Sequence, residues 1–203
     1  EAHEAEQSLS NAGYLTISLE CELAQRAADI TRPTDETPEI DQATYASRIL
    51  SLSRCLAASG RRDEALKTAQ EATNLYRTLA KHNPAAHTPD LAMSLNTLAI
   101  CLDSNGQQRE ALTTAQDATN LYRTLAKHNP AAHTPDLAMS LNNLASYLDN
   151  NGQQREALQT AQEAVTIRRT LAEHNPAAYT PDLAMSLNNL AKRLDNNGQQ
   201  REA

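Results

Sequence analysis

The sequence predicts an all-α fold, a right-handed solenoid of antiparallel helix–turn–helix repeats, from three observations. One is a period of 46 residues, marked by Gly60, Gly106, Gly152 and Gly198. Another is internal identity, since residues 89–134 match residues 135–180 at 34 of 46 positions and residues 181–203 match residues 135–157 at 21 of 23. The third is composition, because the apolar residues are mostly Ala and Leu, with no Trp and no Phe. A fixed period in this range is typical of stacked helical modules.

The first helix of each unit (helix A) is predicted to begin at Pro89, because Thr88 offers an N-cap hydroxyl and proline suits the first helical position. The helix should end at the Asn105-Gly106 pair, since glycine tolerates the left-handed conformation of a helix end. Its apolar stripe recurs at intervals of four, three and four residues, at Leu91, Leu95, Leu98 and Leu102.

The second helix (helix B) is predicted to begin near Gln107 and to stop at Asn129, because the following Pro130 disfavours a helical conformation there. Its buried stripe consists of Ala111, Ala115, Ala118, Tyr122 and Leu125. Alanine at a helix contact lets two backbones approach closely, so a bulky replacement should overpack. Residues 131–134 are predicted to be a linker to the next Thr-Pro-Asp start. Neither helix can bury its stripe alone, so each hairpin must pack on its neighbours.

These patterns resemble the tetratricopeptide repeat. The matching positions of the third unit are Leu141, Leu144, Ala145, Leu148, Gly152, Ala157, Ala161 and Ala164. The unit departs from the pattern because Leu or Ala stands at both aromatic positions, and its period exceeds the family's, which is about 34 residues. This long unit is similar to that of kinesin light chains and of repeat arrays attached to STAND-type signalling ATPases, including NOD-like receptors. The resemblance covers residues 43–203 and implies a module that binds proteins.

The period also divides the chain into segments. Residues 1–42 are predicted to be an irregular N-terminal helix and a Pro-containing loop, residues 43–88, 89–134 and 135–180 repeats 1 to 3, and residues 181–203 a half repeat with helix A only. The N-terminal helix, over Glu4–Ile30, is interpreted as a degenerate helix B with four leucines available for burial: Leu9, Leu15, Leu19 and Leu23. The end within a unit indicates a fragment of a longer array. The alternative is end-to-end self-association of open ends.

Charge and cysteine usage narrow the function classes. The net charge of -7 argues against a nucleic-acid or anionic-membrane partner. No apolar run is long enough to span a bilayer. Cys21, Cys55 and Cys101 are odd in number and widely spaced, so we expect reduced, unpaired thiols and a cytoplasmic location.

The candidate binding surface lies on helix A. On this helix, repeats 2 and 3 differ at only four positions, the first at Thr97/Asn143 and the last at Ser104/Asn150. These four positions share one stripe of the helix, and we expect a stripe that is free to vary to face solvent. A row of asparagines recurs beside it, and an amide side chain can both donate to and accept from successive peptide groups. The opposing interpretation is that these polar residues are merely solvated or bond locally to their own helix. The predicted site residues are Arg54, Asn96, Ile100, Ser104, Asn142, Asn143, Ser146, Asn150, Asn188, Asn189 and Lys192.

Charges near this surface have both signs. Asp103, Asp149 and Asp195 would add negative charge along it, and Arg54, Lys192 and Arg193 positive charge at its two ends. A mixed-charge peptide is therefore as plausible a ligand as a basic one.

Signals for chemistry are weak. The recurring histidines, at positions 82, 128 and 174 with two more at 87 and 133, are placed where the helix C-terminal dipole favours them, and we expect no metal. The sequence contains no Ser/His/Asp arrangement and no phosphate-binding loop, so we expect neither an enzyme nor a cofactor. The predicted function is capture of a peptide or partner protein by the helix A face, as the sensing or docking arm of a larger signalling protein. The alternatives are a self-assembly module and a regulatory appendage on a catalytic domain outside this sequence.

Overall fold

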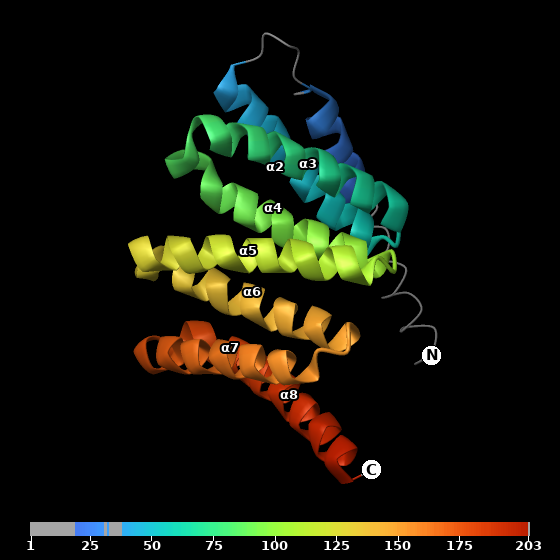
Figure 1. Cartoon of the computed structure of the whole chain (residues 1–203). Coiled ribbons are helices and arrows are strands. Elements are labelled where there is room, and N and C mark those ends of the chain that lie inside the picture. The colour runs from blue at the N-terminus through green and yellow to red at the C-terminus, as the bar shows by residue number, and fades with distance from the viewer. Residues whose placement is uncertain (1–18, 31, 33–37, 203) are drawn as a thin grey trace, which may run out of the picture. The chain divides into compact units, whose positions relative to one another are not determined.

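The computed structural model describes residues 19–30, 32 and 38–202, which contain helices and no strand (Figure 1). The chain divides into two compact units, Glu1–Gly106 and Gln107–Ala203. In each unit, helices that follow one another in the chain pack side by side. The predicted all-α class is confirmed. The first unit holds a helix over residues 19–30, α2 (Glu39–Ala58), α3 (Arg62–His82) and α4 (Pro84–Ser104), and the second holds α5 (Gln108–His128), α6 (Pro130–Asn150), α7 (Gln154–His174) and α8 (Pro176–Glu202).

Each hairpin turns at a glycine, as the period predicted. Gly60, Gly106 and Gly152 have φ values of 79°, 77° and 76°. Nothing lies within 4 Å of where a Cβ would stand at any of them, so these positions require glycine for the backbone conformation and not for space.

Asparagines next to these glycines tie one hairpin to the next. The Asn105 Nδ2 donates to the carbonyl oxygen of Arg62 at 3.1 Å, at the start of the preceding helix B, and also to the Cys101 carbonyl in its own helix. The Asn151 Nδ2 repeats this arrangement with the carbonyl of Gln108, again at 3.1 Å. Both bonds reach backbone acceptors, so the link does not depend on the partner's side chain.

Helix A begins earlier than predicted. Helix α4 starts at Pro84, and the side-chain oxygen of Asn83 accepts a hydrogen bond from the backbone N–H of Ala86. Pro89 lies inside α4, and the Thr88 hydroxyl, predicted to be the N-cap, donates instead to the Pro84 carbonyl at 2.6 Å. An asparagine cap followed by proline at the first helical position is the stronger start signal, and the helix tolerates one missing N–H at Pro89.

The same helix start recurs in the second compact unit. Helix α6 begins at Pro130 with Asn129 as its cap, so residues 131–134 are the first turns of a helix and the predicted linker is wrong. Helix B, in contrast, ends at His128 as the sequence indicates. Because the hairpins begin at these prolines, we propose Pro84, Pro130 and Pro176 as the natural starts of the repeating unit.

The predicted small-residue contacts lie in the core. Ala111, Ala118, Ala157 and Ala164 are completely buried, which confirms close approach of the helix backbones. The leucine stripe of helix A is buried too at Leu95, Leu98 and Leu102.

The contact between helix B and the next helix A changes its chemistry along the chain. In the α5–α6 pair, the hydroxyls of Thr119 and Ser140 lie 2.9 Å apart. In the α7–α8 pair, Val165 has replaced the threonine, and the buried Arg168 donates to the Ser186 hydroxyl at 2.8 Å instead. Helix α8 is therefore attached through a buried guanidinium where α6 uses a hydroxyl pair.

The N-terminal helix packs differently from the prediction. Leu19 and Leu23 are exposed, and the buried residues are Cys21 and Ala28, seven positions apart on one face. The helix contacts α2 through this face, because the Arg48 guanidinium donates to the Ala27 carbonyl at 3.0 Å. The predicted segment Glu4–Ser18, with Leu9 and Leu15, lies outside the described residues, as does most of the predicted loop at 31–39.

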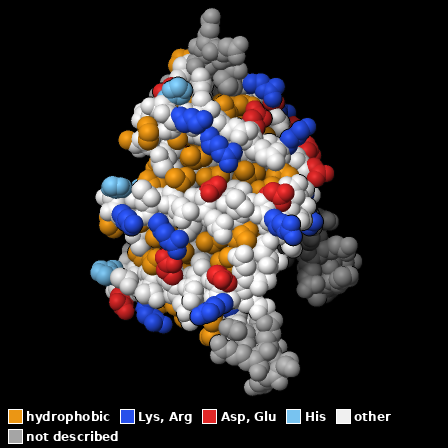
Figure 2. Space-filling model, viewed as in Figure 1, with side chains coloured by type: hydrophobic (Ala, Val, Ile, Leu, Met, Phe, Trp, Pro, Cys, Tyr) orange, Lys and Arg blue, Asp and Glu red, His pale blue; other side chains and the backbone are white. Residues whose placement is uncertain are grey.

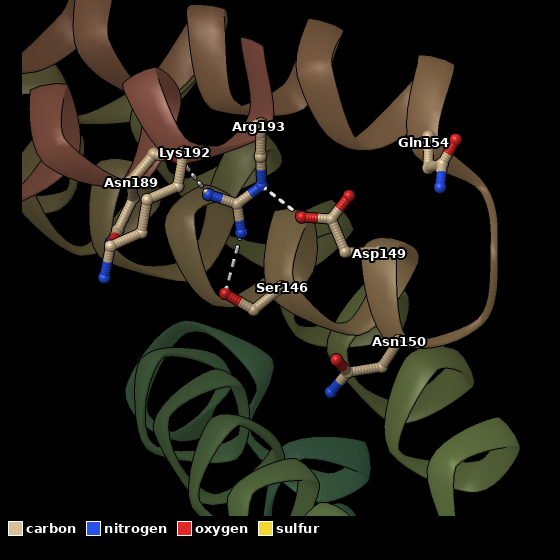
Figure 3. A pocket seen from close by; sticks show the side chains of 7 residues that line it. All are labelled: Ser146, Asp149, Asn150, Gln154, Asn189, Lys192 and Arg193. Atoms are coloured by element: carbon tan, nitrogen blue, oxygen red, sulfur yellow. Dashed lines mark hydrogen bonds and ion pairs between the residues drawn. The ribbon is translucent and has the colours of Figure 1, made fainter. Parts of the chain in front are cut away.

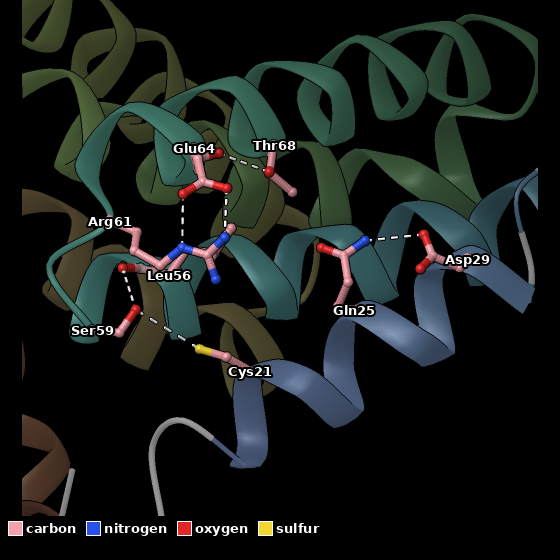
Figure 4. A network of polar contacts seen from close by, with 8 residues as sticks. All are labelled: Cys21, Gln25, Asp29, Leu56, Ser59, Arg61, Glu64 and Thr68. Atoms are coloured by element: carbon pink, nitrogen blue, oxygen red, sulfur yellow. Dashed lines mark hydrogen bonds and ion pairs between the residues drawn. The ribbon is translucent and has the colours of Figure 1, made fainter. Parts of the chain in front are cut away.

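Two of the three cysteines are paired. Cys21 forms a disulfide with Cys55 of α2, with the two Cα atoms 5.4 Å apart, and Figure 4 shows Cys21 beside Ser59 in the same region. The prediction of three unpaired thiols is therefore wrong for this pair. Sequence spacing did not reveal it, because the two cysteines approach only when the N-terminal helix lies along α2. Cys101 is a free, buried thiol, as predicted.

Helix α8 continues past the last expected turn. It runs to Glu202 through Gly198, where the three other units reverse direction. Within the described part of the chain, no helix has the length and apolar character needed to cross a membrane.

Candidate recognition surface

Side chains from two successive copies of helix A meet in the second unit. The Asn189 Nδ2 on α8 donates to the Asn142 Oδ1 on α6 at 3.1 Å. One turn further along both helices, the Arg193 Nη2 donates to the Ser146 hydroxyl at 2.9 Å. Residues of one helix four apart lie on the same face, so the two bonds form consecutive cross-links between α6 and α8.

Arg193 is the centre of this contact. Its side chain is 8% exposed, its Nε lies 2.7 Å from the Asp149 Oδ2, and its Nη1 donates to the Asn189 carbonyl at 3.0 Å. Burial raises the pKa of Asp149 above its usual range, and the neighbouring guanidinium opposes that rise. A guanidinium held by three acceptors from two helices is fixed in position, and so is the surface around it.

These side chains line a pocket of about 450 Å³, shown in Figure 3. The lining contains two cations and one carboxylate, and every other lining side chain is a neutral amide or hydroxyl. Such a lining can donate to and accept from peptide groups. The lining residues are Ser146, Asp149, Asn150, Gln154, Asn189, Lys192 and Arg193.

Four predicted site residues therefore come together here: Ser146, Asn150, Asn189 and Lys192. Asn142 adjoins them through its bond to Asn189. Asn143 is half-buried and Asn188 is exposed, and neither lines the pocket.

The predicted site residues of the first unit are not gathered in this way. Arg54 and Ile100 are exposed, and Asn96 is buried. Ser104 lines a separate pocket of about 660 Å³ at the hairpin turns, together with Arg62, Asp63 and Asp103.

The predicted solvent-facing stripe is wrong at several positions. Thr97, Cys101 and Tyr147 vary between units and yet are buried. The position that holds Cys101 and Tyr147 in repeats 2 and 3 holds Cys55 in repeat 1, where it forms the disulfide. In the half repeat it holds Arg193, which is also buried. At this position Cys55 contacts the N-terminal helix, which directly precedes α2, and Arg193 contacts α6, the previous helix A. Variation there reflects a change of neighbour and not exposure.

The asparagines of the predicted row on helix A also differ in exposure. Asn96 and Asn142 are buried, whereas Asn188 is exposed. The side-chain Oδ1 of Asn142 already accepts a hydrogen bond from Asn189, so Asn142 helps to hold α6 and α8 together.

Sequence reasoning missed the place of Gln154 in the pocket and the central position of Arg193. Gln154 begins α7, a helix B, whereas the predicted site lies entirely on helix A. Its place after the Gly152 turn could have revealed it, because the turn returns the chain beside Asn150. Arg193 was counted only as a surface charge.

The histidines are used locally. The His87 Nε2 lies 2.9 Å from the Glu39 Oε1, across α4 and α2, and the His174 Nδ1 lies 2.7 Å from the Thr170 carbonyl. Over the ranges that the structure describes, no three His, Cys, Asp or Glu side chains cluster in a way that could hold a metal ion.

The face of the molecule seen in Figure 2 is mixed in charge. Acidic and basic side chains are interspersed on the face seen in Figure 2, with apolar side chains between them. The pocket lining, with one cation in excess, contrasts with the net charge of -7 of the whole chain.

The repeated hairpin with a glycine turn and alanine contacts defines this protein as an array of helix–turn–helix repeats. Residues 137–177 match a family model described as the tetratricopeptide repeat. The matched segment covers all of α7 and α6 from Leu137 onward. Residues 89–134 share 34 of 46 positions with residues 135–180, which contain it. Over these residues the chain is similar to tetratricopeptide repeats. No curated protein matches it.

Solved structures show the same fold. A protein from Podosopora anserina that carries a provisional kinesin light chain name, with nearly identical TPR-like repeats, superposes with a TM-score of 0.68 at 20% identity, covering 98% of this chain and 88% of that one. The apo form of RapI has a TM-score of 0.60 at 18% identity, covering 80% of this chain and 41% of that one. BtubC from P. vanneervenii has a TM-score of 0.51 at 17% identity, covering 90% and 84%.

Proposed function

We propose that the chain is a non-catalytic interaction module that binds a peptide or an extended segment of a partner protein in the α6–α8 pocket. The observation that carries the proposal is the pocket itself, where polar side chains of two successive helix A copies surround a fixed guanidinium. The fold supports it, because stacked helical repeats present extended surfaces for binding.

The lining indicates the chemistry of the ligand. Arg193 and Asp149 neutralise one another at 2.7 Å, which leaves the charge of Lys192 in excess. The amides of Gln154 and Asn189 suit backbone peptide groups. We therefore infer that the bound segment is extended and carries an acidic group near Lys192.

The cellular setting is part of the proposal. The long repeat resembles arrays in NOD-like and STAND signalling proteins, so the module would act as a sensing or docking arm in the cytoplasm. The Cys21–Cys55 disulfide removes the reduced-thiol argument for that location, and the signalling resemblance is what remains to support it. The alternative of a regulatory appendage requires no outside ligand.

A peptide library displayed on phage and selected on this chain tests the proposal. The selected peptides should bind the triple variant Asn150→Ala, Gln154→Ala, Lys192→Ala at least about a hundredfold more weakly, since each lost hydrogen bond contributes roughly 1 kcal/mol. Lys127→Ala, an exposed lysine at the end of α5, is the matched control and should bind normally. Equal binding by the triple variant would place the site elsewhere, and failure to select any peptide would favour the appendage.

A further inference from the structure

The N-terminal helix resembles a helix B with small residues at its buried positions. Residues 24–27 of this helix, Ala-Gln-Arg-Ala, repeat the Ala-Gln-Glu-Ala of residues 69–72 in α3. In this alignment Cys21 stands where α3 has Leu66, and both side chains are buried. The N-terminal helix therefore has a disulfide-bonded cysteine at a position where α3 has a large apolar side chain.

The large apolar side chains of the N-terminal helix are not buried. Leu19, Leu23 and Ile30 are exposed, whereas Cys21 and Ala28 are only 5% and 3% exposed. Hydrophobic stabilisation is proportional to the apolar area removed from water, and side chains as small as these supply little of it. We therefore expect the packing of residues 19–30 to hold the helix weakly without the covalent bond.

The disulfide and a hydrogen bond attach the helix to one face of α2. The disulfide joins Cys21 to Cys55, and the Arg48 guanidinium donates to the Ala27 carbonyl at 3.0 Å. Arg48 and Cys55 are seven residues apart, so they lie on the same face of α2. A disulfide stabilises a folded arrangement much more than one half-exposed hydrogen bond does. The covalent bond is therefore the stronger of these two attachments.

The other helices of the first compact unit have a core of their own. Tyr76 and Leu79 of α3 and Leu95 of α4 are almost completely buried, and α3 packs against both α2 and α4. Loss of the N-terminal helix would leave these contacts in place, so the disulfide is a local attachment.

We propose that the Cys21–Cys55 disulfide is a reversible latch, which a dithiol reductant opens to release the N-terminal helix from α2 while α2, α3 and α4 stay folded. The surface of the first unit then depends on the redox state of its surroundings. The latch belongs to the first compact unit and the recognition pocket to the second, so this proposal does not rest on peptide binding.

The latch opens by thiol–disulfide exchange. Cys55 is half-buried whereas Cys21 is buried, so a thiolate of the reductant attacks the sulfur of Cys55. The S–S bond breaks, and its electron pair goes to the Cys21 sulfur, which takes a proton from water. The second thiol of the reductant loses its proton and attacks the mixed disulfide, and Cys55 leaves as a thiolate that is then protonated. Two electrons pass to the protein, and the reductant leaves as a disulfide.

Reduction replaces the covalent joint by a weak one. The Ser59 hydroxyl oxygen lies 3.9 Å from the Cys21 sulfur and donates to the Leu56 carbonyl at 2.9 Å, so it is placed to accept from the released thiol (Figure 4). A thiol is a weak donor. The helix therefore leaves α2 and uncovers the face of α2 that contains Arg48 and Cys55.

Release gives the first unit an apolar surface that the oxidised chain lacks. Leu52 is 4% exposed in the oxidised chain and lies on the same face of α2 as Arg48 and Cys55, four residues after the first. Opening of the latch exposes this leucine beside a guanidinium.

Hydrogen exchange of the full chain, followed by mass spectrometry before and after treatment with dithiothreitol, tests the latch. Amides of residues 19–30 should exchange about 30-fold faster or more after reduction, because a typical disulfide changes an opening equilibrium by at least this factor. Amides of α3 should not change. Reoxidation with oxidised glutathione should restore the slow exchange.

Three variants serve as controls. Cys21→Ser and Cys55→Ser should each show fast exchange in residues 19–30 with or without dithiothreitol, whereas Cys101→Ser should respond like the unmodified chain. Unchanged exchange in residues 19–30 after complete reduction would overturn the proposal, because the helix would then stay docked without the bond. So would faster exchange throughout α3, which would make the disulfide a support of the whole unit, or a disulfide that dithiothreitol does not reduce in the folded chain.

Discussion

Removal of Arg193 should release α8 from α6. Arg193→Ala deletes the ion pair with Asp149 and the hydrogen bond to Ser146. Together with the hydrogen bond from the Asn189 side chain to the Asn142 side chain, these contacts cross-link the two helices. It leaves the Asp149 carboxylate in a partly buried site without its cation. The neighbouring Lys192 is exposed, so Lys192→Ala is the matched control.

The size of the effect follows from burial. Removing one member of a fully buried ion pair costs about 3–5 kcal/mol, because the other charge is left unpaired. The Asp149 side chain is 30% exposed and water can reach it, so we expect about 2–3 kcal/mol. The double variant Arg193→Ala, Asp149→Ala should recover part of this loss and give a coupling free energy of about 1–2 kcal/mol.

Hydrogen exchange of the α8 amides, followed by mass spectrometry, measures the local effect directly. Amides of α8 should exchange about 30- to 150-fold faster in Arg193→Ala, since 1.4 kcal/mol corresponds to a factor of ten, and those of α5 should not change. Unchanged exchange in α8, or the same acceleration by Lys192→Ala, would refute the idea that this guanidinium anchors the helix.

Four further predictions concern the scaffold. Thiol titration of the unfolded, unreduced chain should find one reactive thiol, Cys101, and reduction should raise the count to three; two or three before reduction would contradict the Cys21–Cys55 link. In the folded chain Cys101 should resist alkylation at pH 8, because burial raises its pKa to about 11 and lowers its thiolate fraction; rapid labelling would contradict this. Gly106→Ala should lower the free energy of unfolding by about 1 kcal/mol through its positive φ alone, as seen in urea denaturation, and a neutral result would mean that the turn relaxes. Ala157→Leu, at a completely buried contact, should cost about 1–3 kcal/mol and lower the Tm, and no change would undermine the assigned packing.

The 46-residue period predicted most of the fold. It placed the turns at Gly60, Gly106 and Gly152 and the end of helix B correctly, because these depend on local backbone preferences of glycine and proline. At Gly198 the expected turn is absent, since α8 continues through it. It misplaced the start of helix A, because two Pro-containing segments, at Pro84 and Pro89, compete as helix starts and only the first has an asparagine cap. The Cys21–Cys55 pair depends on how one helix lies on another, which a local pattern does not encode.

The site was harder to predict for a geometric reason. A helix A in this array contacts helices on more than one side, so a residue outside the leucine stripe is not necessarily exposed. Tyr147 and Arg193 are buried at such positions. Amide and hydroxyl types led to Ser146 and Asn189, which line the pocket. Whether such a side chain faces the pocket or bonds to a neighbouring helix is decided only when α6 and α8 are placed side by side.

The asparagine bonds at the hairpin turns have a consequence for how such a chain can grow. Asn105 and Asn151 each reach a backbone carbonyl 43 residues earlier, in the preceding hairpin. An insertion or deletion of one whole unit that carries this asparagine therefore brings a new donor to an equivalent acceptor, whatever side chain stands at the acceptor position. Unequal exchange between nearly identical units could thus change the length of the protein in a single genetic event and leave every joint chemically complete.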